Sequence, residues 1–272
     1  MNYQNPKIPE GINISDEHPL KDFAAMLIGV GVFIVAAFVI IFALAEWLVR
    51  FVPFEVETRL AESTVVGTLV PAVTTASKTQ KYLTALTADL VQQQQLPEDI
   101  SVTVHYIEGD TVNAYATLGG HIIIYQGLLE KLPNENALAM VLAHEIAHIK
   151  HRDPIIAMGR GVTIALAMAS LSGVGENAVA ETLINQINFL TAMAFSRDQE
   201  KDADDEALKT LLAYYGHIKG AEDLFALFQH HQSFEPPEFL SSHPVNQERI
   251  DNIRLFQQAN NYTGATRPLP PL

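Results

Sequence analysis

The sequence has no cysteine, and its 17 lysine and arginine residues are outnumbered by 31 aspartate and glutamate residues. Without cysteine, disulfide bonds, thiolate metal sites and cysteine nucleophiles are all excluded. The formal net charge of −14 leaves no basic excess to neutralise phosphates, so we expect no nucleic-acid partner. The sequence also lacks a phosphate-binding glycine-rich loop and the G-x-S-x-G motif of serine hydrolases.

Apolar residues, by contrast, are abundant, at 48% of the 272 positions. That share excludes a disordered chain, because such chains cannot bury enough apolar surface. The length suits one domain of moderate size, or one domain with an appendage. The mean hydropathy of +0.12 is high for an acidic soluble protein, so we expect part of the apolar content to lie outside a globular core.

The run Phe23–Ala45 contains no charged residue, and Asp22 and Glu46 border it. As a helix that rises ~1.5 Å per residue, the run reaches about 35 Å, enough to cross about 30 Å of hydrocarbon. It begins too late and is too long for a cleaved signal peptide, and it is too long for an ordinary core helix. We therefore predict a single-pass membrane anchor over 23–45, with the lipid bilayer as its partner.

The basic residues near the anchor do not orient it, because Lys7 and Lys21 precede it and Arg50 and Arg59 follow it. A single anchor near the N-terminus commonly precedes an exported domain. We therefore favour an extracytoplasmic location, on the periplasmic side, for the residues after the anchor.

A second apolar region, Gly161–Phe195, is split by Glu176 and Glu181 into two stretches that are short for a membrane span. Two buried helices joined by a turn are the expected structure of this region. A hairpin that dips into the bilayer surface is the alternative.

Periodicity and capping signals predict several helices in the remaining chain. Leucines at three- and four-residue spacing predict a helix over Ser77–Gln94. Asn134 is the predicted N-cap of a helix from Glu135 to about Arg152, which Asp153-Pro154 then breaks. Further helices are predicted around 198–214, 219–232 and 245–258.

Alternating apolar residues predict three strands, Ser101–Ile107, Thr111–Leu118 and His121–Tyr125. Glu108-Gly109-Asp110 and Gly119-Gly120 supply the turns between them, so we expect an antiparallel meander. The predicted fold class is α+β, a helical domain with a small antiparallel sheet plus one N-terminal transmembrane helix.

Turn and composition signals divide the chain into five parts. A polar, flexible tail is followed by the anchor, a connector, the main domain and a loose, proline-rich tail. Their predicted ranges are 1–22, 23–45, 46–75, 76–258 and 259–272.

Residues 144–148 read His-Glu-Ile-Ala-His, an H-E-x-x-H motif within the predicted central helix. Residues four apart on a helix differ by about 40° in direction, so both imidazoles can bind one metal ion. Glu145 lies about 100° around the helix from His144, where it can flank the metal and act as a general base. Neutral imidazoles suit Zn²⁺, and a catalytic zinc site keeps three protein ligands and one open position.

A third ligand is expected from a second helix, where Glu200 and Asp204 share one face. Glu200 would complete a His₂Glu site, and Asp204 could accept the free ring N–H of a ligating histidine. The alternative for an acidic helix face is plain solvation, which we expect for Asp202, Asp205 and Glu206.

The segments H-E-I-A-H-I-K-H-R-D and S-R-x-x-E-x-x-A-D together resemble the HtpX-like zinc metallopeptidases. These gluzincin-type membrane enzymes are related to the CAAX prenyl proteases and to periplasmic quality-control proteases of Gram-negative bacteria. The resemblance spans roughly residues 75–258 and implies a zincin-like domain. Three further segments carry it: Asn113-Ala114-Tyr115-Ala116 with Gly119-Gly120, Gly127-Leu128-Leu129, and Ser242-His243-Pro244 with Arg249-Ile250.

Carried over by position, the resemblance implies one Zn²⁺ bound by His144, His148 and Glu200, with Glu145 as the catalytic acid and base. It also implies supporting roles for three residues outside this set. Asp204 would support a ligand, Arg249 would lie close by, and His243 would gate the site or stabilise the oxyanion.

The expected function is hydrolysis of peptide bonds by a membrane-anchored zinc endopeptidase in protein quality control. An extended polypeptide would add to the strand edge at Asn113, Ala114 and Tyr115. Two other classes stay open. One is a latent, chaperone-like or adaptor-like member of the same fold, whose zinc site is plugged by His243. The other is a membrane scaffold that uses the acidic face and needs no metal.

Overall fold

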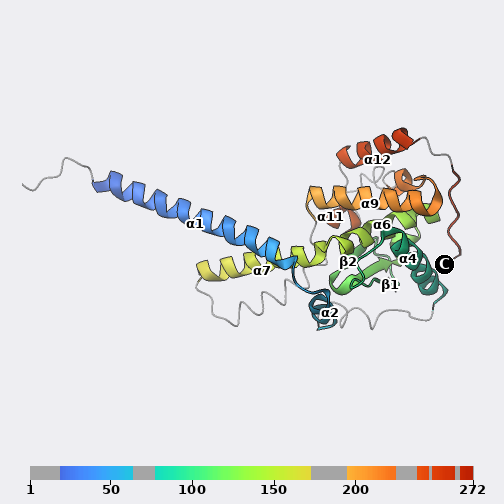
Figure 1. Cartoon of the computed structure of the whole chain (residues 1–272), viewed down its shortest axis with the longest axis horizontal. Coiled ribbons are helices and arrows are strands. Elements are labelled where there is room, and N and C mark those ends of the chain that lie inside the picture. The colour runs from blue at the N-terminus through green and yellow to red at the C-terminus, as the bar shows by residue number, and fades with distance from the viewer. Residues whose placement is uncertain are drawn as a thin grey trace, which may run out of the picture. The chain divides into compact units, whose positions relative to one another are not determined.

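The computed structural model describes residues 19–63, 77–172, 195–224, 238–244, 247–260 and 264–271. The chain divides into two units, Met1–Leu44 and Ala45–Leu272. The first contains most of helix α1 (Pro19–Val49), and the second contains a small sheet and the remaining helices (Figure 1). The fold is α+β, as expected, and mostly helical.

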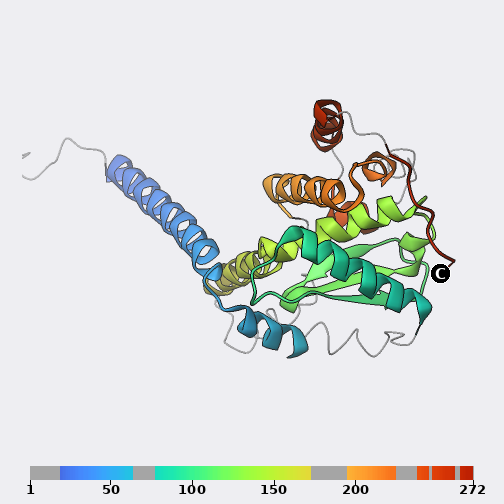
Figure 2. The same cartoon turned by 45° about the vertical axis from the view of Figure 1, so that its right-hand side comes forward.

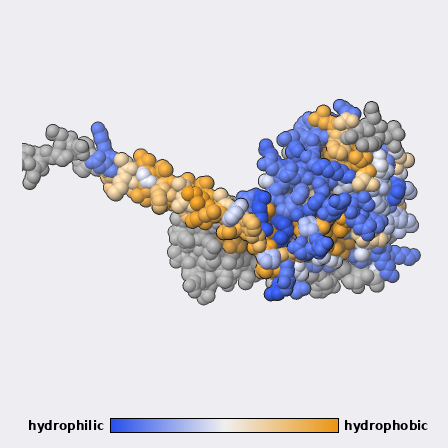
Figure 3. All heavy atoms as spheres, viewed as in Figure 1, coloured by the Kyte–Doolittle hydropathy of each residue, from blue (hydrophilic) through white to orange (hydrophobic). Residues whose placement is uncertain are grey.

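Helix α1 exposes apolar side chains along its length. Phe33 is 73% exposed and Ile28 is 68% exposed, and Figure 3 shows hydrophobic side chains along this helix. By length and composition the helix could cross a membrane. It extends beyond the predicted anchor 23–45 at both ends, whereas residues 1–18 lie outside the described residues.

The second unit contains a three-stranded sheet with the order β1-β3-β2. Strand β1 (Thr103–Ile107) pairs with β3 (His121–Tyr125) in parallel, whereas β2 (Ala114–Thr117) pairs with β3 in the antiparallel direction. The sheet is therefore mixed, and the prediction of an antiparallel meander is wrong. Strands β1 and β2 are also shorter than the predicted 101–107 and 111–118.

The strand order follows from the path of the loop between β1 and β2. The loop passes the end of β3, where Gly127 N donates to Gly109 O at 3.0 Å. A Cβ on Gly127 would come within 2.4 Å of the Asp110 carbonyl oxygen, so glycine permits this close passage. The chain thus enters β2 on the far side of β3. The reversal at Gly119-Gly120, with φ of 71° and 76°, makes that pair antiparallel.

The outer edge of β1 is closed by a side chain of helix α4 (Lys78–Gln94). Gln80 Nε2 donates to Val104 O at 2.8 Å, and Gln80 Oε1 accepts from Tyr106 N at 2.7 Å. One carboxamide therefore makes the hydrogen bonds that a further strand would make at this edge.

Helices α4 and α6 (Glu135–Lys150) begin where the sequence predicts. Ser77 Oγ accepts from Gln80 N at 2.9 Å, and Asn134 Oδ1 accepts from Ala137 N at 2.9 Å. Each side chain satisfies a backbone N–H that has no partner within its helix. Both predicted helix starts are confirmed.

Helix α6 is the centre of the core, and all of its residues from 136 to 149 are buried. Figure 2 shows it between the sheet and helix α9 (Arg197–Tyr215). Burial of each large apolar side chain contributes roughly 1.5–3 kcal/mol. The surrounding core includes Leu83, Leu90, Ile122, Ile124, Leu138, Leu142 and Ile146.

A short helix, α2 (Phe54–Ser63), lies within the predicted connector 46–75 and was not anticipated. Its buried Glu57 accepts from Gly119 N at 3.1 Å and from Arg152 Nε at 2.9 Å. A Cβ on Gly119 would come within 2.8 Å of the Ala61 side chain, so the turn before β3 packs closely on α2. This part of the connector therefore belongs to the folded unit.

Helix α7 (Asp153–Ser172) follows α6 after a single break in the backbone. Arg152 has φ of 64°, a left-handed conformation between Lys150, the last residue of α6, and Asp153, the first residue of α7. The predicted helix break therefore lies just before Asp153-Pro154. The predicted apolar region Gly161–Phe195 is described only to residue 172 and again from 195. Whether the rest forms buried helices or a hairpin at a membrane stays a prediction.

Two later helices, α11 (Glu238–Ser242) and α12 (Gln247–Asn260), complete the described elements. Helices α9 and α12 match the predictions around 198–214 and 245–258 to within a few residues. The predicted helix 219–232 is described only to residue 224. Helix α11 is too short to produce a periodic signal, and the sequence did not predict it.

The end of the chain is held at the start of α6. Glu135 N donates to Arg267 O at 2.8 Å, and Arg267 N donates to Asn136 Oδ1 at 2.8 Å. The Arg267 guanidinium lies 4.8 Å from the centre of the Tyr215 ring. The chain around Arg267 is therefore attached to the start of α6, and the division at residue 259 stays a prediction.

Candidate metal centre

The two histidines of the H-E-x-x-H motif lie on buried α6 and turn toward one interior position. His144 Nε2 and His148 Nε2 are 3.0 Å apart. His144 is 3% exposed and His148 is fully buried. The one-turn spacing therefore brings two ring nitrogens together away from solvent, as expected.

Glu200 reaches this position from α9. Its Oε2 lies 3.4 Å from His144 Nε2, and its Oε1 lies 3.6 Å from His148 Nε2. A capping box formed by Ser196 and Gln199 fixes the first turn of α9, immediately before Glu200. The carboxylate is thus delivered by a well-defined helix start.

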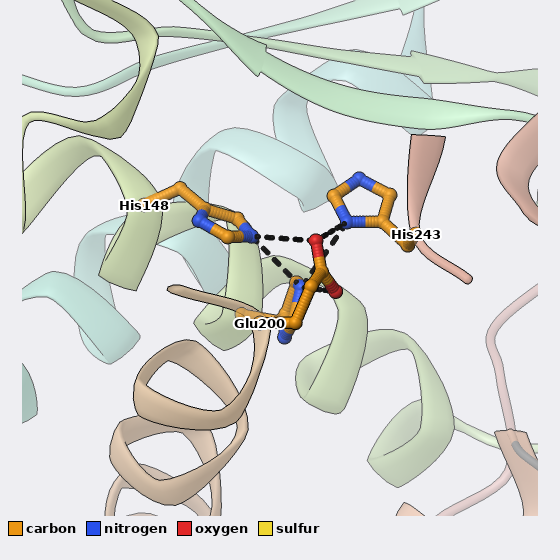
Figure 4. A group of neighbouring side chains, drawn as sticks. His148, Glu200 and His243 are labelled. Carbon is orange, nitrogen blue, oxygen red and sulfur yellow. Dashed lines mark hydrogen bonds and ion pairs between the residues drawn. The ribbon is translucent and has the colours of Figure 1, made fainter. Parts of the chain in front are cut away.

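His243 approaches the same position from the segment after α11. Its Nδ1 lies 3.0 Å from Glu200 Oε1 and 3.3 Å from His144 Nε2. Figure 4 shows His148, Glu200 and His243 converging from different elements. Four buried residues, His144, His148, Glu200 and His243, each place one ligand atom within 4.8 Å of the others.

These separations fit a tetrahedral zinc site. With zinc–ligand bonds of about 2.0–2.1 Å, neighbouring ligand atoms lie about 3.3 Å apart. Five of the six pairs among these residues, measured to either Glu200 oxygen, lie 3.0 to 3.6 Å apart, close to that value, and all four ligand atoms lie within 4.8 Å of one another. Nitrogen and carboxylate oxygen are also the donor types that zinc accepts.

A carboxylate faces the outer ring nitrogen of each motif histidine. His144 Nδ1 lies 2.9 Å from Asp204 Oδ1, and His148 Nδ1 lies 2.8 Å from Asp153 Oδ2. Such partners fix the tautomer of a ligating histidine, so that Nε2 presents its lone pair to the metal. The sequence suggested Asp204 for this position.

Asp153 was missed, because the sequence presented it only as part of the helix break before Pro154. The left-handed backbone at Arg152 turns the chain so that Asp153 faces back toward His148. An acidic residue directly after the break, five positions beyond the second histidine, was the available signal.

Arg249, on α12, holds two of the carboxylates together. Its Nε and Nη2 donate to Asp204 at 2.6 and 2.8 Å, and its Nη1 lies 2.7 Å from Glu200 Oε2. The planar guanidinium matches this paired arrangement. Arg249 therefore orients Glu200 and the partner of His144 at the same time.

The charges of the cluster favour a cation. Burial alone would lower the pKa of His144, but hydrogen bonds to Asp204 and Glu200 raise it to about 10. Burial alone would raise the pKa of Glu200, but His243 and His144 hold it well below its usual range. Burial and the charge of His144 lower the pKa of His148. Without a metal, a proton on His144 offsets the carboxylates, and a bound metal would displace that proton.

Glu145 lies between the edge of the sheet and His243. Its Oε2 accepts from Ala116 N at 2.7 Å. Its Oε1 lies 3.3 Å from His243 Nε2, and this oxygen makes no hydrogen bond with the part of the chain that is described. Glu145 therefore adjoins the metal cluster with one oxygen available for proton transfer.

The predicted substrate strand runs beside Glu145. Asn113, Ala114 and Tyr115 are buried at the start of β2. Ala116 N points to Glu145 and not to β3, so this edge of β2 faces the cluster. Just upstream, Val112 O accepts from Phe239 N of α11 at 3.2 Å, so α11 covers the beginning of the same edge.

Comparison with known families finds a match to the model described as Peptidase family M48. The match covers residues 77–256, about two thirds of the chain. It includes α4, the sheet, α6, α9 and most of α12, and hence every residue of the metal cluster.

Three curated relatives illustrate the similarity. The Beta-barrel assembly-enhancing protease of Escherichia coli (strain K12) is 29% identical over 191 residues, 64% of this chain and 38% of that protein. The Mitochondrial metalloendopeptidase OMA1 of Schizosaccharomyces pombe is 32% identical over 161 residues, 57% of this chain and 46% of that protein. Metalloprotease YcaL of Escherichia coli (strain K12) is 27% identical over 152 residues, 55% and 59% of the two chains. The chain thus spans only about two fifths of the first relative.

Proposed function

Because the chain belongs to peptidase family M48, we propose that it is a membrane-anchored, zinc-dependent metalloendopeptidase that hydrolyses peptide bonds. The family assignment confirms the resemblance to zinc metallopeptidases that the motifs carry. The proposal rests on one observation, the convergence of four buried donor atoms from α6, α9 and the segment after α11. Helix α1 would supply the membrane anchor.

His144, His148 and Glu200 would hold the zinc ion, as the tetrahedral separations support. When bound, zinc would supply the Lewis acidity that polarises a carbonyl group and acidifies water. Asp204, Asp153 and the Arg249 guanidinium would keep these ligands oriented.

Glu145 would transfer the proton. Its free Oε1 takes a proton from water as the water oxygen attacks the peptide carbonyl carbon. As the carbon–nitrogen bond breaks, the same carboxyl group delivers that proton to the leaving amine nitrogen. The hydrogen bond from Ala116 N holds the second oxygen in place during both steps.

An extended polypeptide would bind along β2 at Asn113, Ala114 and Tyr115. The backbone of Ala114 lies on the same edge as Ala116 N, whereas Asn113 O already accepts from Tyr125 N of β3. Strand addition supplies affinity through main-chain hydrogen bonds and so tolerates varied sequences. Because α11 covers the start of this edge, the peptide must displace or pass it.

A role in protein quality control is proposed from the printed names of the relatives. One Escherichia coli relative is named as a protease that enhances β-barrel assembly, and we extend a role of this kind to this chain. We place the catalytic domain of this chain on the extracytoplasmic, periplasmic side of a membrane. Protease accessibility in intact spheroplasts would test that side directly.

Metal removal tests the proposal as a whole. The full-length chain in detergent micelles should contain one zinc per chain by atomic emission and should cleave an unfolded protein such as casein. Chelation should lower the cleavage rate by at least about 100-fold, because the Lewis acid is lost, and added zinc should restore it. Full activity in protein shown to be metal-free would contradict the proposal.

The second candidate function, a latent member of the fold, is favoured by the position of His243. Its Nδ1 occupies the fourth corner of the cluster, which a catalytic site keeps open. In this state His243 would exclude substrate until the segment after α11 moves.

His243→Ala is therefore expected to raise casein cleavage about 10-fold while zinc content is retained. That increase corresponds to a resting state in which roughly 90% of the molecules are plugged. His217→Ala, which truncates another buried histidine away from the cluster, is the matched control. A 10-fold loss of cleavage would instead assign His243 to oxyanion stabilisation and contradict the plug.

A further inference from the structure

Gln199 joins the starts of two helices through its side chain. Its Oε1 accepts from Ser196 N at 3.0 Å and from Arg160 Nη1 at 3.2 Å. Its Nε2 donates to Asp153 Oδ1 at 2.6 Å. All three partners are therefore held by one carboxamide, which uses both its oxygen and its nitrogen.

On the inner side, this contact leads to the metal cluster by two routes. Asp153 uses its other oxygen, Oδ2, to accept from His148 Nδ1 at 2.8 Å. Gln199 also directly precedes Glu200 in the first turns of α9. The orientation of His148 and the placement of Glu200 thus depend on the same side chain.

On the outer side, the contact leads to the last turns of α1. Arg160 Nη2 lies 2.6 Å from Glu46 Oε1, and Glu46 is the first charged residue after the apolar run. A Cβ on Gly159 would come within 2.6 Å of Val49, so α7 packs closely on the end of α1 at this level. A cavity of about 430 Å³ beside these groups is lined by Glu46, Arg50, Asp153, Arg160 and Gln199, among others.

We propose that Glu46, Arg160 and Gln199 are positioning residues that connect the membrane-exit end of α1 to His148 and Glu200. The proposal rests on the proposed function, because it assigns these residues to the geometry of the zinc site. The series Glu46–Arg160–Gln199–Asp153–His148 is continuous, and every link is 3.2 Å or shorter. The last turn of α1, at Glu46, is thereby linked to the ligand geometry.

The links differ in expected strength. Asp153 is almost fully buried, so its contact with Gln199 is poorly screened by water. The side chains of Arg160 and Glu46 are 25% and 30% exposed, so their ion pair is weaker. Effects on the metal should therefore decrease from Gln199 to Arg160 to Glu46.

Gln199→Glu separates positioning from simple helix capping. Glutamate at this place preserves the capping box with Ser196 and can still accept from Arg160. It cannot donate to Asp153, and it sets two carboxylates against each other. We expect zinc affinity of the full-length chain in nanodiscs to fall about 10-fold. The melting temperature of the metal-free protein reports any general loss of folding.

Arg160→Met tests the outer link and should lower zinc affinity about 3-fold. Glu46→Gln alone should lower it about 2-fold, and it should add nothing in the Arg160→Met background, because both changes break the same contact. Arg59→Met is the matched control. It removes an exposed arginine on α2 that pairs with Glu55.

Competition with a chelator measures zinc affinity, and the visible spectrum of the cobalt-substituted protein reports ligand geometry independently of proteolysis. Adding Asp153→Asn to Gln199→Glu reverses the donor and acceptor, and should recover part of the lost affinity. If Gln199→Glu and Arg160→Met both match the wild type in zinc affinity and cobalt spectrum, the positioning roles are overturned and the proposed function is unaffected. A wild-type chain that binds no zinc would remove the proposed function as well.

Discussion

Glu145→Gln is expected to abolish measurable casein cleavage while the zinc content stays at one per chain. General acid–base catalysis contributes about 10²–10⁴-fold, and a carboxamide cannot take up the proton of the attacking water. The variant should fold normally, since the amide oxygen can still accept from Ala116 N. Atomic emission and a fluorescent casein assay on the same preparation provide both measurements.

Glu130→Gln is the matched control for this prediction, because it makes the same chemical change at an exposed glutamate near the sheet. It should leave both zinc content and cleavage unchanged. Retained cleavage in Glu145→Gln would end the assignment of this residue as the acid and base, whatever the metal content.

Glu200→Ala is expected to lower zinc affinity by more than about 100-fold, beyond the effect of losing an outer hydrogen-bond partner. The change removes one of three proposed ligands and also leaves Arg249 Nη1 without its 2.7 Å contact. Arg249 stays paired with Asp204 through Nε and Nη2, so the change weakens the pairing of its buried charge and leaves a space where the carboxylate was. Glu200→Gln, which preserves the shape, therefore accompanies it. Zinc content after gel filtration is the measurement.

Asp202→Ala controls for the loss of acidic charge on the same helix, since Asp202 is exposed and lies two residues after Glu200, about 200° around the helix. Its zinc content should equal that of the wild type. Normal zinc content in both Glu200 variants would show that the third ligand lies elsewhere.

The helices and the paired histidines could be predicted because their signals are local. Leucine spacing identifies the helix from Ser77, and the N-cap Asn134 identifies the start of the next one. A four-residue spacing fixes the relation between His144 and His148 on any helix. Glu200 could be suggested by its chemistry, but its distance from the histidines depends on how α6 and α9 pack.

The strand order could not be predicted, because it depends on one close passage at Gly127 between distant segments. Asp153 and Gln199 were missed for a related reason. The first needs the left-handed backbone of Arg152 to face His148. The second reaches outward only because α7 and α9 begin side by side.

The carboxamide of Gln80 has a consequence for how the sheet meets other chains. Membrane-anchored proteins meet one another often, and an unpaired edge strand can form hydrogen bonds with the edge strand of a neighbouring molecule. Because Gln80 pairs with two backbone groups at the β1 edge, the proposed addition of a polypeptide strand is left to the opposite edge, at β2 beside Glu145. A polypeptide that adds at β2, as proposed, would therefore lie beside the carboxylate that is proposed to take part in its hydrolysis.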